Sequence, residues 1–371
     1  MIRNVSDPGI TLGKLSIAPR PESDDGKASF EDGPDKPDFT DEELSALTLQ
    51  DFNLMGFVGE GGFSKVFFAE HDKTKKVYAL KLMCKQNIAI PNISKIGRNE
   101  AAILQQLDSP FIIKYFGLLD TPKWIGLLTE LACNDTLQDF AQRHTDKLNA
   151  IGKKFFLAEI FLAIKYLQEK DIAHRDIKCE NVLLSAQGHA KLADFGFAIG
   201  GMTADKTTIG AVGTPACVAP EVFTSDGYTR ACDIWSFGVA VFELLTSFTL
   251  MAFVDEKMIC DFMRDFLKHK LEINLTELTD QIACDLVRKC LQLEKNRISI
   301  EEIQAHAYFS DTCWSSLTTI VHKDTSAFEI MKREDFNEPM FSKDCDCLLN
   351  TCVCGTYQGT FLNFDSVNND I

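Results

Sequence analysis

Two stretches of the sequence hold the residue types that phosphoryl transfer requires. Residues 174–181 read His-Arg-Asp-Ile-Lys-Cys-Glu-Asn, and a second stretch, Asp-Phe-Gly, begins at Asp194. A carboxylate such as Asp176 can orient an attacking hydroxyl and accept its proton, and a cation such as Lys178 can stabilise the charge of a moving phosphate. The side-chain oxygens of Asn181 and Asp194 are hard ligands of the kind that Mg²⁺ prefers. This spacing indicates a magnesium-dependent phosphoryl-transfer site.

A glycine-rich segment and a lysine-bearing strand precede these stretches. Residues 59–67 read Gly-Glu-Gly-Gly-Phe-Ser-Lys-Val-Phe, and residues 77–81 read Val-Tyr-Ala-Leu-Lys. A glycine cluster by itself is more often a turn than a nucleotide site, but its position ahead of this strand reverses that interpretation. We therefore expect a hairpin whose backbone amides cover phosphates, followed by a cation, Lys81, that binds them.

Residues from about 50 to 309 resemble a eukaryotic Ser/Thr protein kinase on the strength of these motifs. The resemblance implies an α+β, bilobal fold, with a small antiparallel β lobe that contains one helix and a larger, mainly helical lobe. ATP would bind in the cleft between the lobes with Mg²⁺, and the gamma-phosphate would pass to Ser or Thr hydroxyls of proteins. We expect a kinase domain at 44–309, with the small lobe at about 50–130 and the large lobe at about 131–309.

The resemblance assigns roles to the residues of the catalytic stretches. Asp176 is the expected catalytic base, Lys178 the phosphate-contacting cation, and Asn181 and Asp194 the magnesium ligands. Lys178 and Thr214 indicate Ser or Thr as the acceptor, since tyrosine kinases usually carry an Ala-Ala-Arg or Arg-Ala-Ala run after the aspartate.

The resemblance also implies an ATP site. Glu100 lies in a predicted helix over residues 93–107 and is expected to pair with Lys81, while residues 111–116 and 126–129 are predicted strands that lead to a hinge. The residues expected around ATP, with Thr129 as gatekeeper and Leu183 beneath the adenine, are Gly59, Glu60, Gly61, Gly62, Phe63, Ser64, Val66, Ala79, Lys81, Glu100, Thr129, Glu130, Ala132 and Leu183.

The activation segment, residues 194–221, ends in Ala-Pro-Glu, and Glu221 is expected to form a buried ion pair with Arg297. In the family, the arginine that stands at Arg175 pairs with a phosphate on this segment. Counting back from Gly-Thr-Pro places Gly210 where the phosphothreonine usually stands. Either the segment differs in shape, with Thr208 as the candidate site, or no phosphate is used.

Further details resemble the AGC group of kinases, especially the cyclic-nucleotide-dependent ones. They are Asp51-Phe52, Tyr78 to Lys81, Asn99-Glu100, Ile103-Leu104, Ser109 to Phe111, Asp194 to Ala198, and Gly213 to Pro215. The chain departs from that pattern at Ser64, which replaces a glycine, at His174, which replaces a tyrosine, and at Cys179, which replaces a proline. Residues 233–236 resemble other kinase groups.

Substrate preference is partly readable from acidic positions. Glu180 and Glu243 match residues that help to bind an arginine ahead of the phosphorylated residue in cyclic-nucleotide-dependent kinases. Thr136 stands where an acid is expected at the end of the hinge, which weakens the ribose and arginine sites. We expect protein substrates with upstream basic residues.

Composition limits the partners. A net charge of -16 and a pI of about 4.9 argue against nucleic acid or an anionic membrane. The chain has neither a spanning segment nor a signal-peptide core, and most of its 13 cysteines are scattered singly, which favours reduced thiols in the cytoplasm. No cyclic-nucleotide-binding domain fits this length, so control by a cyclic nucleotide would need a separate regulatory subunit. An upstream kinase is the other regulatory partner considered.

Two alternative functions stay open on this evidence. A pseudokinase scaffold is disfavoured because all the catalytic residues are present. A calmodulin-dependent-like kinase is disfavoured because residues 310–371 contain no basic amphipathic helix.

Residues 1–43 are an acidic, disordered leader by composition. The role of Cys345, Cys347, Cys352 and Cys354, as plain thiols or as ligands of a thiophilic metal, is left open.

The end of the chain resembles the AGC hydrophobic motif. Residues 361–365 read Phe-Leu-Asn-Phe-Asp, and in the family the two aromatic side chains dock into a pocket of the small lobe. Asp365 stands near the position of the usual phosphate, so we interpret it as a built-in charge mimic. The alternative is a chance pair of phenylalanines.

Deletion of residues 361–371 is therefore expected to lower activity or stability, because Phe361 and Phe364 would each lose about 2–3 kcal/mol of burial at most. Peptide phosphorylation and thermal unfolding of the truncated chain measure the two effects. A truncated enzyme with unchanged rate and midpoint contradicts the docking hypothesis.

Overall fold

The computed structural model describes residues 47–61, 64–86, 92–132, 136–145, 147–185, 188–224, 226–251, 256–268 and 272–317. The predictions for Gly62, Phe63, Phe361, Phe364 and the four paired cysteines concern residues outside these ranges.

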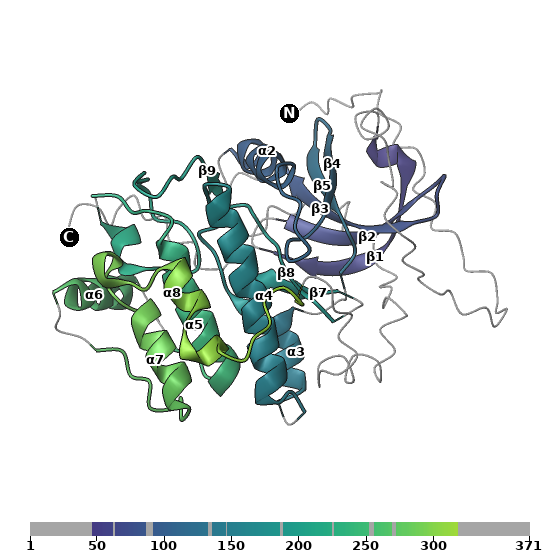
Figure 1. The fold of residues 1–371 in the computed structure, drawn as a ribbon. Coiled ribbons are helices and arrows are strands. Elements are labelled where there is room, and N and C mark those ends of the chain that lie inside the picture. Colours follow the sequence, from purple (N-terminus) through teal and green to yellow (C-terminus); the bar gives the residue numbers. More distant parts are fainter. Residues whose placement is uncertain are drawn as a thin grey trace.

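A five-stranded antiparallel sheet forms the small lobe (Figure 1). A single 3₁₀ turn, Leu49–Asp51, leads into it. Its strands are β1 (Phe52–Glu60), β2 (Ser64–His71), β3 (Val77–Cys84), β4 (Tyr115–Asp120) and β5 (Trp124–Thr129). They lie in the order β1-β2-β3-β5-β4, so the lysine-bearing strand β3 is at the centre.

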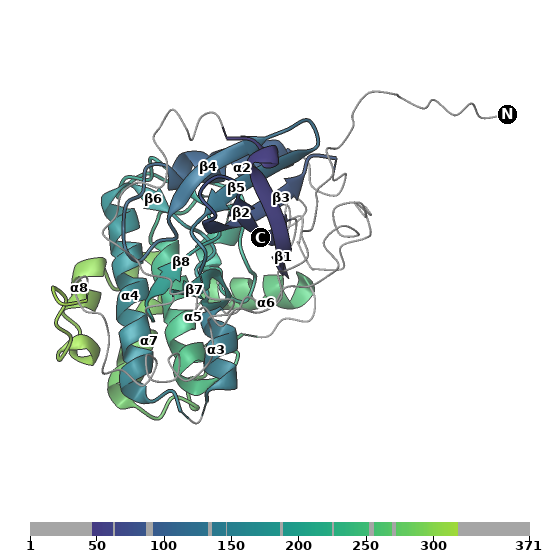
Figure 2. The same ribbon diagram turned by 90° about the vertical axis from the view of Figure 1, so that its right-hand side faces the viewer.

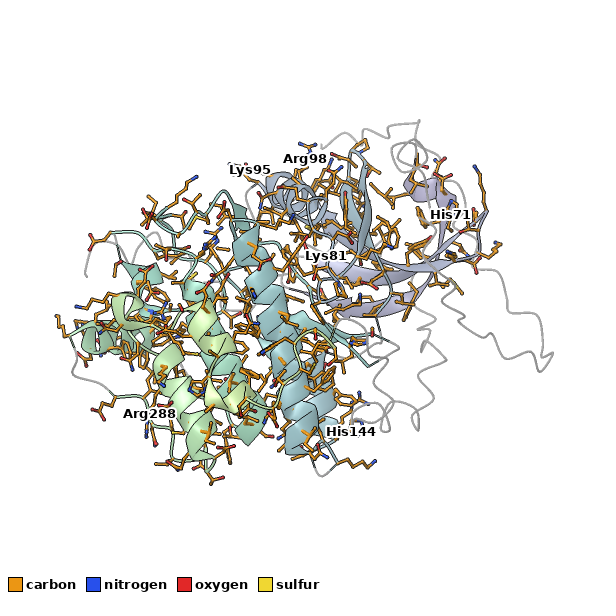
Figure 3. All side chains as sticks on the ribbon, viewed as in Figure 1. His71, Lys81, Lys95, Arg98, His144 and Arg288 are labelled. Carbon is orange, nitrogen blue, oxygen red and sulfur yellow. The ribbon has the colours of Figure 1, made fainter. Side chains whose placement is uncertain are left out.

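The pleat of β3 decides which of its residues face the rest of the protein. Leu80 and Leu82 are buried with Phe67 in a cluster on one face of the sheet. Because side chains alternate along a strand, Ala79 and Lys81 point to the opposite face. Figure 3 shows Lys81 where the sheet meets the helical part of the molecule.

Helix α2 (Ile93–Leu104) packs on the sheet through a close contact. A Cβ added at Gly97 would lie 2.8 Å from Met83 Cε and 3.0 Å from Ile125 Cδ1, so the absence of a side chain lets the helix approach the strands. The helix ends three residues before the predicted boundary, and Glu100 on it is buried.

The large lobe is mainly helical and lies below the sheet in Figure 2. Its helices are α3 (Leu137–Arg143), α4 (Ala150–Glu169), α5 (Cys232–Thr246), α6 (Glu256–Leu267), α7 (Gln281–Cys290) and α8 (Ile300–Gln304). Short 3₁₀ turns at Cys179–Asn181, Pro220–Phe223, Glu294–Asn296 and Ala307–Phe309 connect them. Within the described ranges, no helix is both long and apolar enough to cross a membrane.

Two short two-stranded antiparallel sheets position the residues singled out from the sequence. Strands β6 (Ile172–Ala173) and β9 (Ile199–Gly200) form one pair, and β7 (Val182–Leu184) and β8 (Ala190–Leu192) form the other. Residues 174–181 therefore lie between β6 and β7, and residues 194–196 lie between β8 and β9. The two stretches meet because β6 and β8, the strands that precede them, both pack against α4.

The predicted strand over residues 111–116 is wrong for its first part, because β4 begins only at Tyr115. The backbone of the preceding residues is used elsewhere: Leu192 N donates to Phe111 O at 2.8 Å, and Ile113 N donates to Leu192 O at 3.0 Å. This segment ties the hairpin β7–β8 to the small lobe instead of extending the sheet.

Glu221 and Arg297 form the predicted ion pair in the large lobe. Arg297 Nη1 lies 2.5 Å from Glu221 Oε1 and Nη2 lies 2.9 Å from Oε2, with the two side chains 1% and 9% exposed. The guanidinium also donates to Ala231 O at 2.9 Å and lies over the ring of Trp235. The pair therefore fixes the end of the activation segment against α5.

Replacing Arg297 with Met leaves the Glu221 carboxylate buried without its partner, and we expect the free energy of unfolding to fall by about 3–5 kcal/mol. The double variant Glu221→Leu/Arg297→Met should recover part of this loss, because no unpaired charge remains. Urea denaturation of both variants measures the difference. A single variant that loses less than about 1 kcal/mol would contradict this account.

Candidate active site

Lys81 joins three elements at the centre of the site. Its Nζ lies 2.8 Å from Glu100 Oε1 on α2 and 2.7 Å from Asp194 Oδ1 on the loop after β8. Burial alone would lower the pKa of Lys81, but the carboxylates of Asp194 and Glu100 outweigh it and raise the pKa. The surrounding protein partly desolvates the Asp194 carboxyl and opposes its ionisation, yet Lys81 holds the pKa of that carboxyl below its usual value. The lysine is therefore a permanent cation.

Asp176 is the centre of a second network, and it is 5% exposed. Its Oδ1 accepts from Thr214 N at 2.8 Å and from the Thr214 hydroxyl at 2.7 Å, and its Oδ2 accepts from Asn181 Nδ2 at 2.8 Å. Lys178 Nζ lies 2.5 Å from Thr214 Oγ1 and 3.4 Å from Asp176 Oδ2. Thr214 of the activation segment thus holds the carboxylate of Asp176 and the ammonium of Lys178 side by side.

The loop that carries Asp176 is fixed by a residue that the sequence argument did not assign to the site. Asp233, at the start of α5, accepts from His174 N at 2.7 Å and from Arg175 N at 2.8 Å, and it is fully buried. Arg175 has a φ of 68° and Asp194 a φ of 59°, a conformation that side-chain-bearing residues seldom adopt. Such strain persists only where surrounding bonds impose it.

His174 links the two stretches through packing. Its ring lies edge-on to Phe195, with the ring centroids 4.7 Å apart, and its Nε2 lies 3.1 Å from Ala193 O. Burial lowers the pKa of His174, so the ring is neutral and donates one hydrogen bond to that carbonyl. A polar but uncharged residue thus joins the start of the catalytic loop to the Asp-Phe-Gly segment.

The glycine-rich hairpin forms strands β1 and β2 beside β3, and it presents Val66 on the face of the sheet that carries Lys81. Gly59 pairs with Val66 between β1 and β2, Val66 pairs with Lys81 between β2 and β3, and Ala79 pairs with Thr129 on β5. Directly paired residues point to the same face of a sheet. Gly61 N donates to Ser64 O at 2.8 Å and closes the turn, and Glu60 at its tip is exposed.

The hinge between the lobes is held by side chains. Glu130 Oε1 accepts from Lys114 N at 2.7 Å and from Lys191 Nζ at 2.8 Å, so its carboxylate is occupied. Thr136 caps α3, because its hydroxyl accepts from Asp139 N at 3.1 Å. Ala132 and Leu183 are partly buried apolar residues packed on the main core, as an adenine floor requires.

The two acidic residues expected to contact substrate are electrostatically coupled. Burial and, to a smaller extent, the nearby charge of Glu180 together raise the pKa of Glu243 to about 7. Glu243 Oε1 accepts from Leu250 N at 3.2 Å, while Glu180 is exposed. A cation placed between the two carboxylates would relieve their repulsion.

The donor set fits a magnesium ion. Both hydrogen bonds of Asn181 use its amide nitrogen, one to Asp176 O at 2.7 Å and one to Asp176 Oδ2, which leaves Oδ1 as the atom for a metal. The side chain of Asp194 is 45% exposed. Among the described residues, no group of three or more His, Cys, Asp and Glu side chains can hold a metal ion alone. Mg²⁺ is usually held by one or two protein oxygens together with substrate phosphates.

The family of the protein follows from comparison with known sequences. Residues 52–309 match the family described as "Protein kinase domain". The chain belongs to the protein kinase family. The cAMP-dependent protein kinase catalytic subunit PRKX of Homo sapiens is 30% identical over 367 residues, which cover 91% of this chain and 98% of that protein.

Other relatives are larger kinases. The cGMP-dependent protein kinases of Eimeria tenella and Toxoplasma gondii are 37% and 36% identical over 277 residues, or 73% of this chain. The matched region is 27% of the length of each of those two proteins. These relatives group the kinase domain with the ATP-dependent Ser/Thr kinases of the AGC group.

Two residues of the kinase site had no local signal strong enough to reveal their contacts. Asp233 is an acid at the start of an otherwise apolar stretch, which signals a buried carboxylate but not its partners. Tyr228 is fully buried and contacts Arg175, which no sequence spacing predicts. Thr208, the candidate phosphorylation site, makes backbone bonds to Tyr228 and no side-chain bond to Arg175 within the described residues.

Proposed function

We propose that this kinase transfers the gamma-phosphate of ATP to Ser or Thr hydroxyls of proteins, with Asp176 as the base. The observation that carries the proposal is the pair of networks around Lys81 and Asp176, which place a cation, a carboxylate and two metal-ligand oxygens together. Magnesium, when bound by Asn181 and Asp194, supplies charge neutralisation for the phosphates.

The chain's own residues prepare the acceptor. Asp176 accepts from Thr214 N and from its hydroxyl, and an incoming substrate hydroxyl would take up one of these bonds. The carboxylate then holds the nucleophile in line and receives its proton as the oxygen attacks. Lys178, whose pKa is raised by the charges of Asp176 and Glu180 against the opposing effect of burial, stays protonated and stabilises the transferred phosphate.

Replacement of Asp176 by Asn tests this proposal. The amide keeps the size of the side chain and one acceptor oxygen but cannot take a proton, so we expect kcat to fall by about 10²–10⁴-fold. Phosphate transfer from ATP and magnesium to a degenerate Ser/Thr peptide library measures it, and nucleotide binding by calorimetry should be unchanged. Equal rates for the two proteins would remove Asp176 from the mechanism. ATP binding without any transfer by the unaltered chain favours the scaffold alternative.

We also propose a preference for upstream arginine, read by Glu180 and Glu243. The support is electrostatic, because two coupled carboxylates and a net charge of -16 attract basic peptides. The loss of the hinge acid at Thr136 leaves this pair as the main site for the arginine, since the threonine hydroxyl caps α3.

The preference is expected to depend on pH. The pKa of Glu243 is raised to about 7, so the carboxyl is neutral below that pH and becomes an anion above it. The ratio of kcat/KM for an arginine peptide to that for its glutamine analogue should therefore rise between pH 6 and pH 8. Glu243→Gln should abolish this rise, and a ratio that is flat with pH in the unaltered enzyme would contradict the assignment.

Control of the kinase is proposed to come from outside the domain. PRKX is named as a catalytic subunit, which supports a separate regulatory subunit for this chain, with an upstream kinase as the other source of control. Docking of Phe361 and Phe364 on the small lobe, and action in the cytoplasm, complete the proposal. Co-purification of this chain with a cyclic-nucleotide-binding protein would directly support the regulatory subunit.

A further inference from the structure

Arg175 binds the activation segment through neutral oxygens. Its Nε donates to Phe197 O at 2.7 Å, and its Nη1 donates to the hydroxyl of Tyr228 at 3.1 Å. Within the part of the chain that the structure describes, no carboxylate lies within ion-pair distance of this guanidinium. The backbone of Arg175 is fixed by Asp233, so the guanidinium is a stationary donor.

Tyr228, which Arg175 holds through its hydroxyl, makes three hydrogen bonds to the activation segment. Its hydroxyl donates to Gly210 O at 3.0 Å. Its backbone N donates to Thr208 O and its backbone O accepts from Thr208 N, both at 2.9 Å. The residue is fully buried, so these bonds are protected from water. One residue outside the segment therefore fixes residues 208–210, through its backbone at Thr208 and through its side chain at Gly210.

The segment is in turn connected to the catalytic carboxylate. A Cβ at Gly213, whose φ is 102°, would lie 2.4 Å from Arg175 O, so the chain runs directly against the backbone of Arg175 at this point. The next residue, Thr214, makes the two hydrogen bonds to Asp176. Displacement of Gly210 would therefore be transmitted over four residues to the base.

Gly210 itself cannot readily be replaced by a residue that carries a phosphate. Its φ is 100°, a conformation that strains any L side chain, and no atom lies within 4 Å of where its Cβ would be.

Arg230, two residues after Tyr228, anchors the other end of the activation segment. Arg230 Nη1 donates to Asp171 Oδ1 at 2.8 Å and to Met202 O at 3.3 Å. Residues 228–230 thus hold the segment at both 202 and 208–210.

We propose that Tyr228 is a positioning residue for phosphoryl transfer: its hydroxyl, bridging Arg175 and Gly210, orders the activation segment without any phosphate on the segment. The inference rests on the proposed kinase function. A phosphate opposite an arginine orders a loop by charge-assisted hydrogen bonds. Here a neutral hydroxyl makes the corresponding contact, so the active geometry is independent of an upstream kinase acting on residues 194–221.

The first arm of the test separates this inference from the proposed function. The full chain, treated with a phosphatase and shown by mass spectrometry to carry no phosphate at 194–221, should keep its peptide-phosphorylation rate, and so should Thr208→Val. Absence of transfer by any form of the chain counts against the kinase function. Transfer that is lost on dephosphorylation, or lost in Thr208→Val, overturns the inference alone.

The second arm tests the hydroxyl. Tyr228→Phe should lower kcat by about 10-fold with little change in KM for ATP, because one buried bridge is lost. Hydrogen exchange of the amides of residues 208–214 should become faster. Tyr166→Phe is the matched control, since it removes a single hydroxyl that accepts from Asp108 N at 2.9 Å in the same lobe. The control should change neither measurement.

A double-variant cycle distinguishes positioning from a loss of folding. Arg175→Lys breaks the same bridge from its other end, together with the bond from Nε to Phe197 O, so adding Tyr228→Phe to Arg175→Lys should slow transfer no further. Additive losses, or a Tyr228→Phe protein with normal kcat and normal exchange, overturn the inference. If Tyr228→Phe does not fold, Arg175→Lys decides by itself: fast exchange at 208–214 with an intact unfolding transition is the expected result, and unchanged exchange contradicts it.

Discussion

The geometry of the site depends on the buried carboxylate of Asp233. This side chain lies at the start of α5, in the core of the large lobe, and accepts the backbone N–H groups of His174 and Arg175. A buried carboxylate is costly unless donors surround it, and a left-handed Arg175 is strained unless bonds impose it. The same two hydrogen bonds satisfy both, because the backbone N–H groups of His174 and Arg175 supply the donors for Asp233 and hold Arg175 in its left-handed conformation. The backbone immediately before Asp176 is therefore fixed to the buried first turn of α5.

From this fixed point, one carboxylate connects the proposed metal ligand Asn181 to the activation segment. Asp176 binds the amide of Asn181 on one side and Thr214 of the activation segment on the other. Lys81 connects the small lobe to the same site. Its ammonium binds Glu100 of α2 and Asp194 of the Asp-Phe-Gly loop. Movement of α2 would therefore shift Glu100 and disturb the position of Lys81, even with every residue of the site unaltered.

Much of the fold was predictable because the strong signals are local. The lysine on a β-strand, the glycine turn before it and the helix that carries Glu100 follow from alternation and periodicity, and all three are present. The strand predicted at residues 111–116 was the failure, because its apolar residues fit a strand equally well but their backbone pairs with Leu192, far along the chain. Periodicity shows that a segment is buried and not which partner takes its hydrogen bonds.

The proposed chemistry could be inferred from the amino-acid sequence, because Asp176, Lys178 and Asn181 are close enough in the chain for one loop to present all three. The pairing of Glu221 with Arg297 was also predictable, on the basis of family resemblance. The hydrogen bond from Arg175 to the Tyr228 hydroxyl, and the bond from that hydroxyl to Gly210 O, are evident only in the folded structure. The physical reason is that a hydrogen bond depends on the direction of two side chains that reach the same point from separate elements, and no periodicity along the chain encodes that meeting.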